Sequence, residues 1–472
     1  MKAHWISTKD ACQRKNYYFR ALRKLNLDRK PEKAIFHITA ESYYVLAVNG
    51  QTVGRGPARG THTTNYFDTW DLYHVLHEGN NEILICCQCM NEDTFLAAPS
   101  QPALIAELEG FFGTDGEWQV QDGTEWRQDV QTYSMQVGFS EWCDFRKTSG
   151  DWSKATVLTT DSPVMRKKLL ARDVPQLIEI AYSPANIPVQ VVVPALKDAD
   201  DIKVSKLMTY EEHRPLLLNL KTLLQPGSGD FTIVPLPNNG GIALVFDFDR
   251  EIIGRFELDV TAPCGTIIDL GHDEELWENR VRTDHSQDSY NFADRYILDG
   301  KRRLVGNTLH QRGFRMVQVV IRNYTDPVVI HGIKAYDVRY PYPRNGSFNS
   351  SDQMLNRIWQ ACVETLSACT TDVFTDCPWR ERAFWVNDMI VENRTTLQAF
   401  GDPRVNARAF RMAVADAFPN GLIPGVCPCP RNLESLILLP TNLFISEMLS
   451  DYYLYTGDAE MVCEVLPALA RI

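Results

Sequence analysis

SDQMLNRIWQACVETLSAC, residues 351–369, marks the point at which the hydrophobic pattern of the chain changes. Its apolar residues recur at helical spacing, at Met354, Leu355, Ile358, Trp359, Cys362, Val363 and Leu366. Ser350, Ser351 and Asp352 precede them as candidate caps. The stretch therefore predicts an amphipathic helix that opens a helical region.

Four more helices are expected after this first one. They are predicted at about 382–400, 403–418, 441–456 and from 458 to the end of the chain. Pro403 suits a first helical turn, and Gly457 suits a helix stop. The last helix carries Pro467 and has no stop signal before Ile472. We expect the chain to end inside a larger helical domain.

The part of the chain before residue 344 has the composition of strands. AESYYVLAVNG, residues 40–50, contains many aromatic and β-branched residues and breaks at Asn49-Gly50, a pair typical of hairpin turns. QTVGRGPARG then indicates a glycine-rich connection, and NNEILICCQC another strand. Residues 187–208 and 242–342 also favour strands. Short strands separated by turns indicate β-sandwich or jelly-roll domains.

Three domains are expected from the length and from one boundary. The chain has 472 residues, and a domain takes roughly 150. A stretch rich in proline and glycine at 223–241 separates the two strand-rich regions. We predict an N-terminal β-sandwich with an extension at 1–222, a second β-sandwich at 223–343 and a helical domain at 344–472.

The composition argues against two classes of partner. The 48 lysines and arginines and the 60 aspartates and glutamates give a net charge of -12, which repels nucleic acid and anionic membrane surfaces. No apolar run approaches the roughly 20 residues of a membrane helix. The start, MKAHWISTKD, shows no secretory signal, and most of the twelve cysteines lie in apolar stretches. Buried free thiols indicate a reducing compartment, so we expect the protein in the cytoplasm.

No metal or cofactor is expected. Cys87 and Cys89, or Cys427 and Cys429, could form half of a zinc site. Such a site needs a second cysteine pair or histidines nearby, and all ten histidines lie at or before His331.

TDCPWRERAFWVND, residues 375–388, has the densest set of chemically active side chains. On the expected helix, Glu381, Trp385 and Asp388 share one face, and Asp376 lies just before it. Such a group resembles a sugar site, where an indole stacks on the ring and one carboxylic acid donates a proton. Arg380 and the other carboxylates would bind hydroxyls.

A plainer interpretation of the same residues is an ordinary exposed helix start. Asp376 would then be a cap, and Glu381 would be favoured by the helix dipole. The positive charges of Arg380 and Arg382 also favour the ionised form of Glu381, which opposes an acid role at neutral pH.

TDCPWRERAFWVND resembles the signature of bacterial α-L-rhamnosidases of glycoside hydrolase family 78. The likeness extends along the chain. YYVLAVNGQTVGRGPARG and YFDTWDLYHVLHEGNNEI resemble the family's N-terminal sandwich. FDFDREIIGRFELDV, LGHDEELWEN and RGFRMVQV are similar to the sandwich before the catalytic domain, and NGLIPGV and DYYLYTGD to its early barrel helices.

The resemblance implies two β-sandwich domains followed by the first part of an (α/α)6 barrel. It implies an inverting glycosidase that needs no cofactor and releases terminal α-L-rhamnose from a rhamnose-containing glycan or glycoside. Glu381 falls on the general acid; Asp376 is grouped with it as catalytic, and with Arg380, Trp385 and Asp388 it binds the rhamnose ring. The family's general base is a glutamate of a late barrel loop, which we expect beyond Ile472.

One stretch departs from the family pattern. In LILLPTNLFISEML, residues 436–449, relatives carry an aspartate after the proline and an aromatic residue slightly later, whereas this chain has Thr441 and then Leu443 to Ser446. Two alternatives therefore stay open. The protein could be a catalytically degenerate carbohydrate-binding protein, or a hydrolase of another deoxysugar or of a uronic acid.

Overall fold

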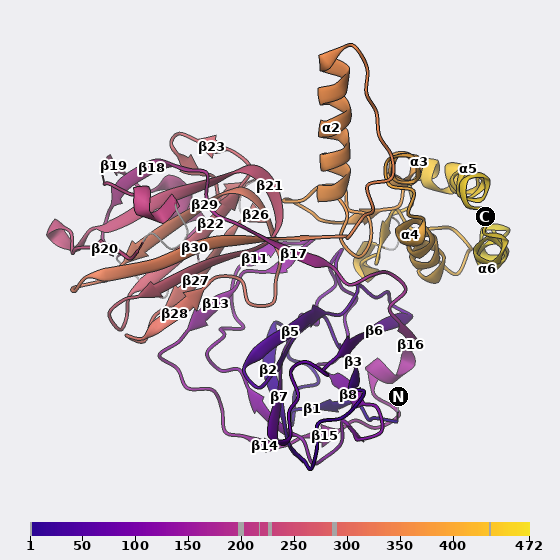
Figure 1. Ribbon diagram of the computed structural model, residues 1–472, viewed down its shortest axis with the longest axis horizontal. Helices are drawn as coiled ribbons and strands as arrows, with labels where there is room; N and C mark the ends of the chain where they lie inside the picture. The colour runs from indigo at the N-terminus through magenta and orange to yellow at the C-terminus, as the bar shows by residue number, and fades with distance from the viewer. Residues whose placement is uncertain (1, 197–202, 217, 225–228, 286–289, 434–435) are drawn as a thin grey trace.

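The computed structural model describes residues 2–472 except 197–202, 217, 225–228, 286–289 and 434–435. Figure 1 shows two strand-rich parts, and a helical part formed by the residues after 343. The expected fold class, β-sandwich domains followed by part of a helical barrel, is confirmed. No helix in the described residues is long and apolar enough to cross a membrane.

The first part is a sandwich of two sheets. One sheet has the order β15 (Thr156–Val157), β1 (Ile6–Ser7), β8 (Leu104–Leu108), β3 (Ile35–Ala40), β6 (Thr64–Asp71) and β16 (Lys168–Ala171), with β9 (Phe112–Gly113) beside β8. The other has the order β14 (Ser153–Lys154), β10 (Gln119–Asp122), β2 (Tyr17–Leu27), β7 (Gly79–Cys89), β4 (Tyr43–Val48) and β5 (Gln51–Gly56). Phe36 and Ile38 of the first sheet are buried against Tyr17, Leu46 and Ile85 of the second.

The hairpin expected at Asn49-Gly50 is present. Val48 pairs with Gln51, and both turn residues have positive φ, 51° at Asn49 and 79° at Gly50. The expectation of a loop after the turn is wrong for its first six residues, which form β5. Gly54 lies in this strand because a Cβ there would come within 2.2 Å of the ring of Trp70. Gly54 is thus needed for close packing against Trp70. Composition alone does not distinguish a glycine needed for packing from one in a flexible loop.

The second part is built on an eleven-stranded sheet. Its main order is β13 (Trp142–Asp144), β27 (Ala293–Ile297), β22 (Ile267–Asp273), β29 (Arg312–Arg322), β21 (Gly241–Thr261), β18 (Asn186–Val193) and β19 (Arg214–Pro215). β30 (Val328–Arg339) pairs with β21, β17 (Ile178–Tyr182) and β20 (Phe231–Ile233), and β28 (Arg302–Val305) pairs with β21. β12 (Gly138–Phe139), β11 (Thr132–Ser134), β26 (Tyr290–Asn291) and β25 (Asp284–His285) form a smaller sheet.

The long strand β21 joins the two ends of this sheet. Its register with β29 shifts between Asp247 and Ile252, so residues before the shift pair with β18 and residues after it with β28 and β30. Strands β17 and β18 lie within the range 1–222 and pair here with strands of the range 223–343. The second sheet therefore draws strands from both ranges.

The expectation that strand structure continues to residue 208 is wrong for the last residues of this stretch. Val204–Tyr210 form the helix α1, which packs against β22 and β27. Val204 and Met208 are buried one helical turn apart, and the hydroxyl of Thr209 accepts hydrogen bonds from the backbone N–H groups of Thr283 and Asp284, at the start of β25. The apolar and β-branched residues that suggested a strand serve a short helix because they cover the sheet. Residues 197–202 of the same stretch lie outside the described part.

The helical part matches four of the five expected helices closely. α2 (Gln353–Ala368) begins after Asp352, whose side chain accepts a hydrogen bond from the backbone N–H of Met354. α4 (Arg404–Ala415) follows Pro403, and α5 (Leu439–Thr456) ends at Gly457, where φ is 67°. α6 (Ala459–Leu469) stops before Ile472, so the expectation that it continues to the last residue is wrong. α3 (Met389–Ala399) begins later than expected.

Candidate active site

The segment 376–388 is not helical, which corrects the helix expected from residue 382. Phe384–Trp385 form the strand β31, which pairs with β32 (Val426–Cys427), and α3 begins only after Asp388. Arg382 has a φ of 53°, a left-handed conformation that an α-helix cannot include. Glu381, Trp385 and Asp388 therefore do not share a helix face.

The structure nevertheless brings Glu381 and Trp385 together. The indole Nε1 of Trp385 donates a hydrogen bond to Oε2 of Glu381 at 3.0 Å. The other carboxylate oxygen lies 2.9 Å from Nη2 of Arg380, and the Glu381 side chain is only 12% exposed. Phe95 of the first sandwich packs edge-on against the indole, with the ring centroids 5.5 Å apart. Glu381 is thus a shielded carboxylate with both oxygens held.

Asp376 closes the loop that carries Glu381. Its Oδ1 accepts a hydrogen bond from the backbone N–H of Ala383 at 2.9 Å, and its own N–H donates to the carbonyl of Ala383. Asp376 therefore caps a loop, whereas the plainer interpretation expected it to cap a helix. Burial raises its pKa, and the nearby charge of Glu381 adds to the effect.

Asp388 and Glu392 extend the acidic group into α3. Asp388 precedes the first turn of α3, but its side chain makes no capping hydrogen bond there. Its pKa is raised by burial and by Glu381. Glu392 was not expected as a site residue, although its spacing of four from Asp388 in a predicted helix could have indicated it. Its pKa is well above the usual value because of burial, Asp388 and Asp376.

We call Asp376, Glu381, Asp388 and Glu392 the acidic cluster. The pKa values of Asp376, Asp388 and Glu392 are each raised in part by the charge of at least one other member of the cluster. Oε2 of Glu392 is buried without a hydrogen-bond partner among the described residues. Crowding of carboxyl groups in a partly buried site favours keeping at least one of them protonated near neutral pH. Such a cluster can supply a proton to a bound substrate.

The loop before Glu381 rests directly on the second sheet. The ring of Trp379 lies 4.6 Å from that of Phe292, and its Nε1 donates to the carbonyl of His272 at 3.2 Å. Gly313 of β29 permits this contact, because a Cβ there would lie 2.0 Å from the carbonyl oxygen of Pro378. The position of Glu381 therefore depends on strand β29.

Arg382 fixes the other end of the loop. It is 6% exposed, and its guanidinium donates to the backbone carbonyl and to the side-chain amide of Gln311. Arg59 of the first sandwich donates to the carbonyl of Arg382 at 3.3 Å. Burial lowers the pKa of Arg382 to about 10, and the positive charges of Arg59 and Arg312 contribute. All three parts of the protein thus hold the loop, and these distant partners have no local sequence signal.

The stretch that departs from the family pattern begins α5. Thr441 is completely buried, and its hydroxyl has no hydrogen-bond partner among the described residues. The side chain of Asn442 bonds to both backbone groups of Ile423, at 2.8 and 3.0 Å. Leu443 and Phe444 are exposed. Thr441 and Asn442 thus pack toward the interior of the helical part.

The described residues contain no group of three or more histidine, cysteine, aspartate or glutamate side chains placed to hold a metal ion. Cys87, Cys89, Cys427 and Cys429 are buried and form no disulfide.

Comparison with known proteins identifies two consecutive regions. Residues 239–336 match the bacterial alpha-L-rhamnosidase concanavalin-like domain, and residues 343–472 the bacterial alpha-L-rhamnosidase 6 hairpin glycosidase domain. An alpha-L-rhamnosidase of Formosa agariphila is 26% identical over 193 residues, which are 39% of this chain and 20% of that protein. The matched region thus spans about a fifth of the length of this relative.

Solved structures share the fold. A family GH78 rhamnosidase of Bacillus sp. GL1 has a TM-score of 0.88 and 20% identity, covering 100% of this chain and 69% of that one. An alpha-L-rhamnosidase of Streptomyces avermitilis, complexed with L-rhamnose, has a TM-score of 0.65 and 17% identity, covering 96% of this chain and 41% of that one. Residues 239–336 and 343–472 are thus bacterial α-L-rhamnosidase domains, and the whole chain shares the fold of the family GH78 rhamnosidase.

Proposed function

We propose that the protein is an inverting glycosidase that releases terminal α-L-rhamnose from rhamnose-containing glycans or glycosides. The observation that carries the proposal is the shielded carboxylate of Glu381, held by Trp385 and surrounded by the rest of the acidic cluster. The curated relative is an alpha-L-rhamnosidase, and the Streptomyces structure holds L-rhamnose, which supports the same sugar here.

Glu381 acts in this proposal as the general acid that protonates the glycosidic oxygen. In the structure its Oε1 is occupied by an ion pair with Arg380 at 2.9 Å. The Arg380 side chain is 54% exposed, so it is free to turn toward a sugar hydroxyl when substrate binds. Burial raises the pKa values of Asp376, Asp388 and Glu392, so the acidic cluster can hold a proton next to Glu381.

Three other residues bind the ring. Trp385 supplies an apolar wall, and Asp376 and Asp388 accept hydrogen bonds from sugar hydroxyls. Inversion also needs a second carboxylate that activates water about 6.5–9.5 Å from the acid, on the opposite face of the ring. By the family resemblance, this base is a glutamate of a later barrel loop.

The test is the variant Glu381→Gln, assayed on an aryl α-L-rhamnoside. Loss of the general acid should lower kcat by about 100-fold or more, while L-rhamnose still binds in calorimetry. Glu447→Gln is the matched control, because Glu447 is an exposed glutamate of α5. Proton NMR of the first product should show β-L-rhamnose, the sign of inversion.

Other outcomes would contradict the proposal. Binding of L-rhamnose without hydrolysis by the unmodified protein would favour the degenerate binding protein. Hydrolysis of a different aryl glycoside in a panel would favour another deoxysugar or a uronic acid as substrate.

We also propose that the protein works in the reducing cytoplasm. None of its twelve cysteines forms a disulfide, and burial raises the pKa of several of the thiols, for example that of Cys86 to about 11. Free buried thiols are typical of reducing compartments. Fractionation of the native cells, with detection by antibody, tests this; recovery from the culture medium would contradict it.

A further inference from the structure

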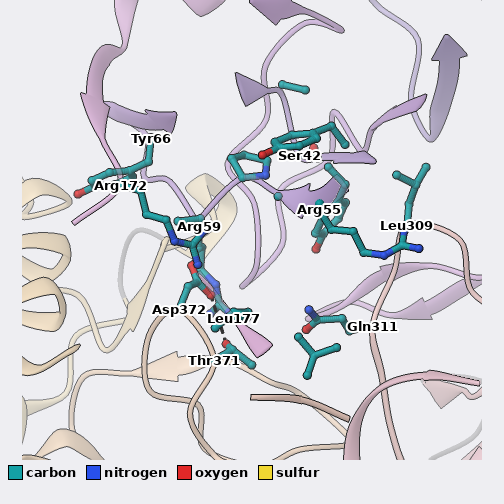
Figure 2. Close-up of a pocket in the computed structure, with 18 of the residues that line it drawn as sticks. Ser42, Arg55, Arg59, Tyr66, Arg172, Leu177, Leu309, Gln311, Thr371 and Asp372 are labelled. Atoms are coloured by element: carbon teal, nitrogen blue, oxygen red, sulfur yellow. Dashed lines mark hydrogen bonds between the residues drawn. The ribbon is translucent and has the colours of Figure 1, made fainter. Parts of the chain in front are cut away.

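A cavity of about 530 Å³ lies where the three parts of the protein meet. Its wall includes β4 and β5 of the first sandwich, β21 and Gln311 of the second part, and Thr371, Asp372 and Arg382 of the helical part. Figure 2 shows Arg59 and Arg172 on one side of the cavity and Arg55 on the other, with Asp372 beside the first pair. Its volume is within the range of small-molecule sites, about 300–1,000 Å³.

The cavity wall has more positive than negative side chains. The cations are Arg55, Arg59, Lys167, Arg172, Arg255 and Arg382, and the carboxylates are Glu41, Glu179, Glu257 and Asp372. Most of the cations are paired. Lys167 binds Glu41, Arg55 and Arg255 both bind Glu179, and Arg172 binds Asp68.

Arg59 and Arg382 are the exceptions. Within the described part of the chain, neither forms a salt bridge, and Nη1 of Arg59 and Nε of Arg382 are buried without an acceptor. Among the described residues, the guanidinium of Arg59 donates only to the backbone carbonyl of Arg382, and the guanidinium of Arg382 donates only to Gln311. Arg382 is buried and Arg59 is half-buried, and two such neighbouring guanidinium groups without a salt bridge are unfavourable.

Asp372 does not neutralise this pair. Its carboxylate accepts from the backbone N–H of Arg59 and lies 3.4 Å from the guanidinium of Arg408, which also binds Asp173. Burial would raise the pKa of Asp372, but Arg59, Arg408 and Arg172 lower it to about 2. Arg172 and Arg408 have their own partners in Asp68 and Asp173, so Asp372 is the carboxylate left for Arg59 and Arg382, and this pair keeps a net positive charge.

We propose that the cavity binds a small carboxylate-bearing molecule of sugar size, with its carboxylate between Arg59 and Arg382. A planar carboxylate fits the guanidinium fork and would supply the missing counter-charge. Tyr66 and Trp70, together with Leu309, add ring and aliphatic surface to the wall for the body of the ligand. The proposal does not depend on rhamnosidase activity.

This site is distinct from the acidic cluster although it begins at the next residue. The side chain of Glu381 binds Trp385, whereas that of Arg382 binds Gln311 in the cavity wall. The left-handed backbone conformation at Arg382 turns the chain, so the side chains of Glu381 and Arg382 point into different sites.

Calorimetry with D-glucuronate and D-glucose tests the proposal, because the two sugars differ in the carboxylate. We expect glucuronate to bind and glucose to bind at least 10-fold more weakly. Arg59→Gln should weaken glucuronate binding by about 10-fold or more, and Arg59→Lys by less. Arg302→Gln is the control, because Arg302 is an exposed arginine on β28, outside the cavity wall. A thermal melt of each variant shows that it is folded.

Several results would overturn the inference. These are failure of glucuronate to bind, equal binding of glucose, or unchanged binding by a folded Arg59→Gln protein. Inorganic sulfate that binds as tightly as glucuronate would overturn the carboxylate class. Glu381→Gln should keep glucuronate binding, and L-rhamnose should not compete with it; competition would place the ligand in the acidic cluster instead.

Discussion

The indole N–H of Trp385 donates a hydrogen bond to Oε2 of Glu381, with 3.0 Å between the nitrogen and the oxygen. Trp385 lies in the short strand β31, and Glu381 lies in the loop before it. The contact depends on the pairing of β31 with β32, which turns Trp385 back toward the loop. One hydrogen bond thus couples the expected proton donor to the expected wall of the sugar site.

Removing this hydrogen bond should slow the reaction. Trp385→Phe keeps an apolar ring but loses the donor to Glu381, so kcat/KM on an aryl rhamnoside should fall by about 10-fold or more. Trp277→Phe is the control, because Trp277 lies on the short strand β23 (Leu276–Trp277) and is partly exposed. An unchanged kcat/KM in Trp385→Phe would show that the bond does not matter for the reaction.

Half-buried Glu251 should make stability depend on pH. Burial raises its pKa to about 9, and the charges of Glu274, Asp337 and Asp273 add to the effect. Between the ordinary glutamate pKa and about 9 the folded state holds a proton that the unfolded state has released, so the free energy of unfolding should fall as pH rises through this window.

Glu251→Gln should remove that contribution. Urea unfolding at pH 5 and at pH 8.5 should show a smaller loss of stability in the variant than in the unmodified protein. Glu447→Gln, an exposed control, should keep the original pH dependence. A steeper loss in Glu251→Gln would contradict the raised pKa.

Gly313→Ala should displace the loop that carries Glu381. The added Cβ would lie 2.0 Å from the carbonyl oxygen of Pro378, so loop or strand must move. We expect a lower Tm and a lower kcat together. Gly332→Ala on β30 is a matched control, because a Cβ there meets nothing within 4 Å. Equal behaviour of the two variants would show that the loop does not depend on β29.

The exposed apolar face of α5 should make the protein associate. Leu443, Phe444, Tyr453, Leu454 and Tyr455 are exposed, and Leu454 is 77% exposed. A large apolar surface on a folded chain favours contact with another copy. Leu454→Glu should lower the average mass in light scattering, whereas Leu304→Glu on β28, where the leucine is 59% exposed, should not. A monomeric unmodified protein would contradict this expectation.

Local signals explain which elements could be predicted from the sequence. Asp352, Gly457 and Asn49-Gly50 act on their own neighbours, and the helix starts, helix ends and hairpin that they indicate are present. The segment 376–388 could not be predicted in the same way. Its spacing of four and three imitates a helix, whereas its conformation is fixed by β32 and Gln311, which are distant in sequence.

The candidate site shows the same division. Asp376, Arg380, Glu381, Trp385 and Asp388 are close in sequence, so one motif names them all. Phe95 comes from another part of the protein, and its edge-on contact with Trp385 depends on how the parts pack. Such contacts follow from tertiary structure, which composition and spacing do not encode locally.

The contact of Pro378 and Trp379 with Gly313 of β29 has a consequence for protein engineering. A chimera that transplants the helical region alone, from residue 344 onward, would leave behind Gly313, Gln311 and the aromatic neighbours of Trp379. The transferable unit is the helical region with the sheet beneath it. Recombination libraries for this family would best keep the helical region and every strand of the eleven-stranded sheet, including β13, β17 and β18 from before β21, from one parent.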